Sequence, residues 1–151
     1  MDVAIALPEV TNGGNVLSVK NTCESHYGID FTLLTYLMSK NNLRIVYMGT
    51  PEFAVPSLEA LIQNGYRVVA VVTAPNKPQG RGQKLVFSPV KDYALQHHLP
   101  VLQPNNLKSS AFVEELKKYE ANLQIVVAFR MLPEVIWNMP ALGTFNLHAS
   151  L

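Results

Sequence analysis

The sequence predicts an α/β fold built on a doubly wound parallel sheet. Short apolar runs rich in β-branched residues alternate along the chain with segments whose apolar residues recur at helical spacing. Strands separated by helices are joined by right-handed crossovers, so they lie parallel in one sheet. The chain has 151 residues and is 48% hydrophobic, which is enough to bury the core of one domain. In such sheets ligands bind beyond the carboxyl ends of the strands, so the residues directly after each strand are the first functional candidates.

The first strand and the helix after it have the clearest boundaries. Residues 43–48 form an apolar run that Gly49 ends, as expected for a strand buried on both faces. Residues 54–64 follow with apolar side chains at helical spacing, and Pro56 is tolerated in the first turn of a helix. Gly65 stands at the position after a helix, where a positive φ is common. A helix therefore joins the first strand to the second.

The alternation continues to the end of the chain. The second strand is residues 67–73, and a loop rich in proline and glycine follows over residues 74–87. The remaining expected elements are a helix at 89–97, an extended piece at 100–102, a helix at 109–119, a strand at 123–128, a short helix from Pro133 and a strand at 144–148. The first candidate positions are those that follow Met48, Thr73, Ala128 and Phe145.

Residues 1–42 differ in character from the rest. Residues 1–37 mix small, polar and apolar side chains without a sustained period, so we expect 1–42 to be an unpatterned extension and 43–151 to be the domain. Met38, which a short polar lead follows, has the features of a natural start. An in-frame upstream read-through or a fusion remnant explains the extension better than a regulatory segment does, because a docking segment would show a period.

Charge, cysteine content and hydropathy exclude several classes of protein. The net charge is only +1, so a basic site for an anionic partner must be local. The single cysteine, Cys23, excludes an internal disulfide and fits a reducing cytoplasm. The longest apolar run, residues 29–38, is interrupted by Asp30 and is too short for a membrane span, so we expect a cytoplasmic protein. A single glycine, Gly49, in place of a three-glycine fingerprint argues against a nicotinamide or flavin site.

A local basic site is present in the loop after the second strand. Residues 74–85 carry Lys77, Arg81 and Lys84 and no acidic residue. A solvated surface loop is the alternative interpretation. However, glycines on both sides of Arg81 let the backbone approach a partner while the guanidinium contacts a phosphate or stacks on a base. This arrangement favours an RNA end as the partner.

The last expected strand carries a pair of polar residues. Asn146 and His148 are two residues apart, so in a strand they point to the same face with Cβ atoms about 7 Å apart. A carboxamide N–H can donate to an oxyanion, and an imidazole can move the proton of an attacking amine, so the pair suits acyl transfer. The alternative is that both are satisfied structural groups. His26, His97 and His98 show no metal-ligand spacing, and no metal site is expected.

Four motifs follow one another along residues 43–151. They are RIVYMGTPEFA at 44–54, the Arg81 loop running into SPVK at 88–91, VVAFRMLP at 126–133 and FNLHASL at 145–151. In this order they resemble the methionyl-tRNA formyltransferase family, and four motifs in a shared order argue against a chance match. The resemblance implies a Rossmann-like formyltransferase fold that is incomplete at its C-terminus, with 43–151 as part of the catalytic domain.

The resemblance also implies roles for individual residues. The asparagine and histidine of the last motif are catalytic in the family, and they fall on Asn146 and His148. The residues implied to border the folate pocket are Phe129, Arg130, Met131, Leu132, Ser150 and Leu151. The basic loop corresponds to the insertion that holds the tRNA acceptor end, which falls on Lys77, Arg81 and Lys84. Many relatives have glycine at the position of Arg130, which leaves the shape of the pocket open there.

The implied reaction moves a formyl group from 10-formyltetrahydrofolate, the formyl donor, to the α-amino group of methionine on initiator tRNA. The family needs no metal, and the resemblance implies a monomer at full length. A third catalytic residue, an aspartate that orients the histidine, lies further along in family members. Because the chain ends at Leu151, the resemblance implies truncation before this aspartate and no activity for the chain alone.

Two alternatives stay open. One is another folate-dependent formyltransferase with the same Asn-x-His pair, which acts on a sugar nucleotide or a purine precursor. Those relatives lack the Gly-Arg-Gly loop followed by Ser-Pro-Val-Lys, so the loop favours the tRNA enzyme. The other is a non-catalytic fragment, because an unfinished parallel sheet leaves an unpaired edge.

Overall fold

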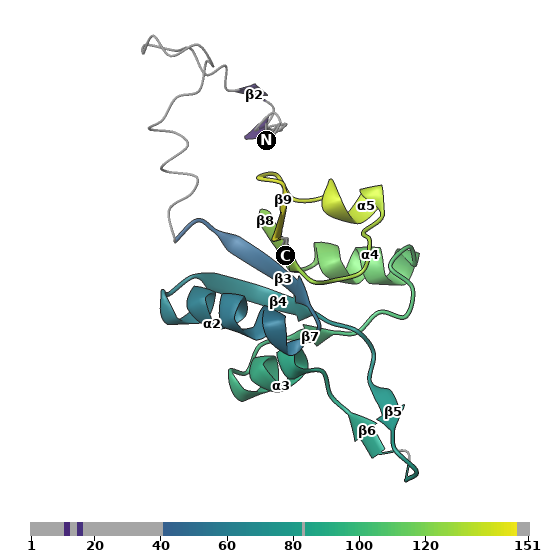
Figure 1. Ribbon diagram of the computed structural model, residues 1–151. Coiled ribbons are helices and arrows are strands. Elements are labelled where there is room, and N and C mark those ends of the chain that lie inside the picture. The colour runs from purple at the N-terminus through teal and green to yellow at the C-terminus, as the bar shows by residue number, and fades with distance from the viewer. Residues whose placement is uncertain (1–10, 13–14, 17–40, 83, 148–151) are drawn as a thin grey trace.

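The computed structural model describes residues 11–12, 15–16, 41–82 and 84–147 (Figure 1). Strands and helices alternate in it as the sequence predicts. The strands of the main sheet are β3 (Arg44–Gly49), β4 (Arg67–Val72), β7 (Val101–Leu102), β8 (Leu123–Val127) and β9 (Thr144–Leu147). The helical elements are the 3₁₀ turn η1 (Glu52–Ala54), α2 (Val55–Gln63), α3 (Pro89–Gln96), α4 (Ser110–Lys117) and α5 (Glu134–Trp137).

The strands form one parallel sheet in the order β7-β4-β3-β8-β9. From the central strand β3 the chain first builds outward through β4 to β7, and then it crosses to the other side of β3 for β8 and β9. This order confirms the doubly wound α/β fold. Because the direction of building reverses between β3 and β8, the loops that leave these two strands diverge, and sheets of this kind bind ligands at that point.

Helices cover both faces of the sheet (Figure 1). On one face α2 and α3 contribute Leu58 and Val90 to a buried cluster, and on the other face α4 and α5 contribute Leu116 and Ile136 to a second cluster. Alternate residues of β3 enter the two clusters. Burial on both sides is the reason why the β3 sequence is almost continuously apolar and does not alternate with polar residues.

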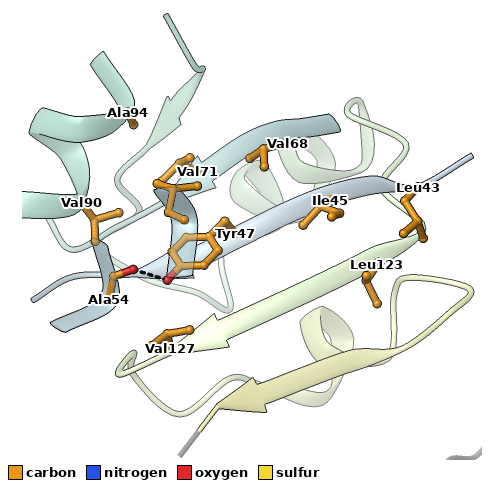
Figure 2. Packing of buried hydrophobic residues seen from close by; sticks show 11 residues of the cluster. Leu43, Ile45, Tyr47, Ala54, Val68, Val71, Val90, Ala94, Leu123 and Val127 are labelled. Carbon is orange, nitrogen blue, oxygen red and sulfur yellow. Dashed lines mark hydrogen bonds between the residues drawn. The ribbon is translucent and has the colours of Figure 1, made fainter. Parts of the chain in front are cut away.

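One strand of the sheet contains a bulge. Ile45 of β3 pairs with Val68 of β4, whereas the next residue of β3 pairs with Ala70, so Val69 is an extra residue in the ladder. As a result Val68 and Val71, which are three positions apart, both lie in the cluster beneath α2 and α3 (Figure 2). A strict two-residue alternation would have sent them to opposite faces.

The ends of the helices follow local sequence signals. The Ser88 hydroxyl oxygen accepts a hydrogen bond from the backbone N–H of Lys91 at 3.1 Å and caps α3, whose first residue is Pro89. Gly65, after α2, has a φ of 75°, in the left-handed region that glycine adopts without strain. The helices and strands of the main sheet therefore begin and end at or near the residues that the sequence predicts.

The expectation of a loop rich in proline and glycine, without strands, over residues 74–87 is wrong. The structure has an antiparallel hairpin there, made of β5 (Lys77–Gln79) and β6 (Lys84–Val86), and Pro78 is one of its paired residues. A two-stranded ladder consists of edges, so a proline can occupy a position where its missing N–H would face solvent. Gly80 begins the turn with a φ of 78°. Proline and glycine here belong to the hairpin and do not exclude it.

In residues 1–37, where the sequence predicts no regular element, the structure has a short antiparallel ladder of β1 (Thr11–Asn12) and β2 (Asn15–Val16). The rest of this segment lies outside the described residues. The division of the chain into 1–42 and 43–151 stays a prediction.

Candidate functional site

The carboxyl ends of β3, β8 and β9 meet at one edge of the sheet. Parallel pairing sets Gly49 beside Val127 and Val127 beside Leu147. Asn146, the expected catalytic residue of β9, lies one position earlier, beside Val126. The turn after β3, the turn after β8 and Asn146 therefore share the edge where a doubly wound sheet binds its ligand.

Gly49 is required by close packing at this edge. A Cβ atom on Gly49 would lie 2.9 Å from the Cβ of Ala54 and 3.0 Å from the carbonyl oxygen of Val127. Real Cβ atoms essentially never come as close as the first distance, and the second is tighter than nine in ten real Cβ contacts, so a side chain at the end of β3 would force β8 or η1 to shift. This glycine serves close contact between segments of the chain.

A buried tyrosine holds the turn after β3. The Tyr47 hydroxyl donates a hydrogen bond to the Ala54 carbonyl oxygen at 2.5 Å (Figure 2). The ring belongs to the same buried cluster as Val71 and Val90. Burial raises the pKa of Tyr47 to about 12, an effect that a hydrogen bond with Ser57 partly opposes, so the hydroxyl remains a donor at neutral pH. The strand and the helical segment after it are thereby tied together at the edge of the site.

The turn after β8 begins with a strained residue. Ala128 has a φ of 48°, in the left-handed region that residues with a Cβ rarely adopt. One such residue costs about 1–2 kcal/mol. Beyond it, Phe129 and Leu132 pack against the cluster beneath α4 and α5. Strain retained at the carboxyl end of a central strand points to a functional constraint on the backbone there.

Arg130 links this turn to the segment after β7. Its guanidinium donates to the carbonyl oxygens of Asn105, at 3.2 Å, and Pro104, at 2.7 Å. The guanidinium carbon also lies 5.4 Å from the centroid of the Phe129 ring. The charged group is therefore held by the protein's own carbonyls beside the turn. Its neighbour Met131 is 94% exposed, so the turn presents an apolar side chain to solvent at the edge of the sheet.

Asn146 lies on an exposed strand. β9 is the last strand of the sheet, and Asn146 is exposed, as are its neighbours Phe145 and Leu147. His148, Ser150 and Leu151 lie outside the described residues. The relative placement of Asn146 and His148 therefore stays a prediction from strand geometry.

The structure brings the three expected RNA-contacting cations onto one hairpin, which projects from the body of the domain (Figure 1). Lys77 is opposite Val86 and Lys84 is opposite Gln79, so the two lysines share one face of the ladder. Arg81 lies in the turn, and all three cations are exposed. The hairpin therefore offers one basic face and a basic tip to a partner.

Sequence reasoning missed a polar cluster at the base of this hairpin. Thr73 is fully buried, and its hydroxyl shares a 2.7 Å hydrogen bond with the hydroxyl of Ser88. The Thr50 hydroxyl accepts from the backbone N–H of Ala74 at 3.3 Å, which links the turn after β3 to the segment that leads into the hairpin. Each of these polar residues directly follows a strand: Thr50 follows β3, Thr73 follows β4 and Gln103 follows β7. This pattern could have identified the cluster.

The candidate site consists of exposed groups and backbone turns. In the part of the chain that the structure describes, every buried side-chain nitrogen or oxygen atom has a hydrogen-bond partner. No three histidine, cysteine, aspartate or glutamate side chains among the described residues gather closely enough to hold a metal ion.

None of the described helices has the length and apolar character needed to cross a membrane.

Comparison with known proteins extends over most of the chain. The chain is 65% identical over 114 residues to the methionyl-tRNA formyltransferase of Bacteroides fragilis, and the aligned region covers 76% of this chain and 35% of the relative. It is 67% identical over 115 residues to the protein of the same name from Parabacteroides distasonis, with 76% and 36% covered. For the protein of that name from Flavobacterium johnsoniae the identity is 65% over 109 residues, with 72% and 35% covered. The chain thus spans about a third of the length of these relatives.

The family assignment rests on a match that contains the whole main sheet. The profile of the formyl transferase family matches residues 43–151. These residues include all strands from β3 to β9, the strained turn after β8, the basic hairpin and Asn146. The chain therefore belongs to the formyl transferase family.

Proposed function

We propose that the protein carrying this chain transfers a formyl group from 10-formyltetrahydrofolate to the α-amino group of methionine on initiator tRNA. The observation that carries the proposal is the placement of Asn146 at the carboxyl edge of the sheet in a chain that also projects a hairpin with three cations. The shared name of relatives at 65–67% identity supports the same reaction.

Two side chains carry the chemistry in this proposal. The methionine amine attacks the formyl carbon, and the Asn146 carboxamide donates to the oxyanion that develops on the tetrahedral intermediate. The bond between the formyl carbon and N10 of the folate then breaks. His148 moves the proton that the amine loses, and this proton ends on the folate nitrogen. Binding that strengthens as the oxyanion forms lowers the barrier of the reaction.

The folate donor lies beside the turn after β8 in the proposed complex. The proposed pocket residues are Phe129, Arg130, Met131, Leu132, Ser150 and Leu151. Strain at Ala128 and the exposed Met131 support this placement, because both lie at the carboxyl edge that carries Asn146. The Arg130 guanidinium, bound to the carbonyl oxygens of Pro104 and Asn105, shapes the rim of the pocket by holding the turn.

The β5–β6 hairpin binds the tRNA acceptor end in this proposal. Lys77 and Lys84 face one side and Arg81 lies at the tip, which suits a phosphate backbone followed by unpaired bases.

We further propose that residues 43–151 are the N-terminal part of a catalytic domain that acts as a monomer in the cytoplasm. Residues 1–42 lie outside this domain. In the proposed mechanism an aspartate orients the His148 imidazole as the third member of the catalytic set.

A substrate comparison tests the proposal. The complete gene product is incubated with 10-formyltetrahydrofolate and, in separate reactions, methionyl initiator tRNA, an amino-sugar nucleotide and an amine-bearing purine precursor. Formyl-methionyl-tRNA is the expected product. Formylation of either small substrate with none of the tRNA would overturn the tRNA assignment.

A further inference from the structure

One lysine holds both ends of the β5–β6 hairpin. Lys91, in the first turn of α3, donates from its ammonium group to the side-chain oxygens of Asn76, at 3.1 Å, and Gln103, at 2.8 Å. The same ammonium group lies 4.0 Å from the centroid of the Phe87 ring. Asn76 directly precedes β5 and Phe87 directly follows β6. Lys91 therefore joins the two stems of the hairpin to each other and to the segment after β7.

Gln103 anchors this lysine to the sheet. The Gln103 amide nitrogen donates to the side-chain oxygen of Asn76 and to the carbonyl oxygen of Ala74, both at 2.9 Å. The Asn76 oxygen thus accepts from Lys91 and from Gln103 together. Gln103 directly follows β7, an edge strand of the main sheet, so the network is anchored at the edge of the sheet.

The hairpin contains too little buried surface to order itself. All of the side chains in β5 and β6 are exposed, and each strand has three residues. An isolated two-stranded hairpin is marginally stable at best in water. Its direction relative to the sheet must therefore come from contacts at its base, where the Lys91 network lies.

The partners of Lys91 are neutral. Two amide oxygens and an aromatic face hold its ammonium group, and the ion pair found among the described residues joins Lys117 and Glu114 instead. A carboxylate in place of the Asn76 or Gln103 amide would bind the ammonium more strongly, but it would cancel a positive charge next to the basic hairpin. Neutral acceptors fix the lysine without placing a negative charge beside the basic hairpin.

We propose that Lys91 is the positioning residue of the β5–β6 hairpin. It fixes the direction of the hairpin relative to the carboxyl edge of the sheet, so that an RNA end bound by Arg81 is presented toward Asn146. Preorganisation of this kind strengthens binding because the hairpin loses less conformational freedom when RNA binds. The RNA part of the inference rests on the proposed function, whereas the ordering of the hairpin can be measured without RNA.

The first experiment measures hairpin order in the complete gene product by amide hydrogen exchange. Lys91→Met keeps the aliphatic stem and removes the hydrogen bonds, so amides of β5 and β6 should exchange about tenfold faster, as expected for easier local opening. Amides of β3 and β8 should keep their exchange rates. Lys91→Arg should restore much of the protection, and Asn76→Ala should reproduce its loss.

The matched control is Lys118→Met, which also removes a positive charge. Lys118 lies at the C-terminal end of α4, and the chain continues from it to the amino end of β8. This variant should leave hairpin exchange unchanged. Unchanged hairpin exchange in both Lys91→Met and Asn76→Ala would overturn the positioning role. A general rise in exchange across β3 and β8 would also overturn it, because Lys91 would then support the whole domain.

The second experiment separates positioning from direct contact with RNA. Binding of an RNA minihelix with a single-stranded 3′ end is measured for Lys91→Met, Arg81→Ala and the double variant. If Lys91 positions the hairpin, Lys91→Met should weaken RNA binding about tenfold and leave the salt slope unchanged. The effect of Lys91→Met should largely disappear when Arg81 is already replaced by alanine. In turnover measurements, Lys91→Met should raise the KM for tRNA and leave the KM for the folate donor unchanged.

Two results would contradict this account. Additive effects together with a salt slope reduced by about one would make Lys91 a direct phosphate ligand. No RNA binding by the unsubstituted protein would overturn the proposed function, and the exchange measurement would still decide whether Lys91 orders the hairpin.

Discussion

The hydroxyl of Tyr47 donates to the carbonyl oxygen of Ala54 at 2.5 Å and closes the turn that leaves the central strand (Figure 2). Tyr47→Phe would remove the tyrosine donor from this buried carbonyl oxygen. Because Ala54 is the N-cap of α2, its carbonyl oxygen still accepts the first hydrogen bond of the helix, so the variant loses one buried hydrogen bond and we expect a loss of about 0.5–1.5 kcal/mol in the free energy of unfolding. Denaturant titration at neutral pH measures it, and a variant as stable as the unsubstituted protein would contradict the structural role of the bond.

The same pair predicts a pH dependence. Burial raises the pKa of Tyr47 to about 12 from its ordinary value of 10.0, so the folded state holds the proton more tightly than the unfolded state. The resulting stabilisation is complete below pH 10 and is lost as the pH rises through about 12. The stability difference between Tyr47→Phe and the unsubstituted protein should therefore shrink above pH 10. A constant difference across this range would contradict the shift.

Gly49→Ala tests the close contact of the turn after β3 with η1 and β8. The added methyl group would meet the Ala54 Cβ at 2.9 Å and the Val127 carbonyl oxygen at 3.0 Å. Overpacking of this kind costs about 1–3 kcal/mol, which should appear as a lower Tm. Gly82→Ala is the matched control, because nothing lies within 4 Å of its added Cβ. Equal Tm values for the two variants would mean that the edge of the site is not closely packed.

Most of the sheet could be predicted from the sequence because its residues carry local signals. A strand buried on both faces is almost continuously apolar, as β3 is after Arg44, and capping residues such as Ser88 and Gly65 fix helix ends without reference to the rest of the fold. The Val69 bulge could not be predicted, because it depends on the register between β3 and β4.

The candidate site was predictable only in part. The parallel sheet placed Asn146, which follows Phe145, at the carboxyl edge, and the composition of residues 74–85 identified the cations. The hairpin itself was missed because Pro78 argues locally against a strand, and the two-stranded ladder tolerates it. The role of Lys91 was hidden for another reason: its partners Asn76 and Gln103 are 15 and 12 residues away in sequence, so no local pattern contains them.

Arg81→Ala tests whether the hairpin contacts RNA. The arginine lies at the exposed tip, so its loss should raise the KM for tRNA far more than the KM for the folate donor. The lost contact is worth about 1–3 kcal/mol of binding free energy. Binding should also depend less steeply on salt, because a phosphate contact is lost. Arg67→Ala, at the opposite, amino end of β4, is the control and should change neither KM. Similar effects of Arg81→Ala on both substrates would make the hairpin a structural element.

Deletion of residues 1–37 tests the expected division of the chain. The segment shows no sustained apolar period in its sequence, so removing it should leave the Tm and the formylation rate of the complete gene product essentially unchanged. Thermal unfolding and initial rates measure both. A large loss of stability or activity would show that this segment contributes to the domain.

The rate of formyl-methionyl-tRNA formation by the complete gene product and its Asn146→Ala variant tests the central claim most directly. We expect the unsubstituted protein to formylate methionyl initiator tRNA. We also expect a kcat about 10²–10³ lower for Asn146→Ala, because a donor to the developing oxyanion is lost. Gln63→Ala removes an exposed carboxamide at the far end of α2 and should keep the full rate. No formylation by the unsubstituted protein, or an equal rate in Asn146→Ala, would contradict the account.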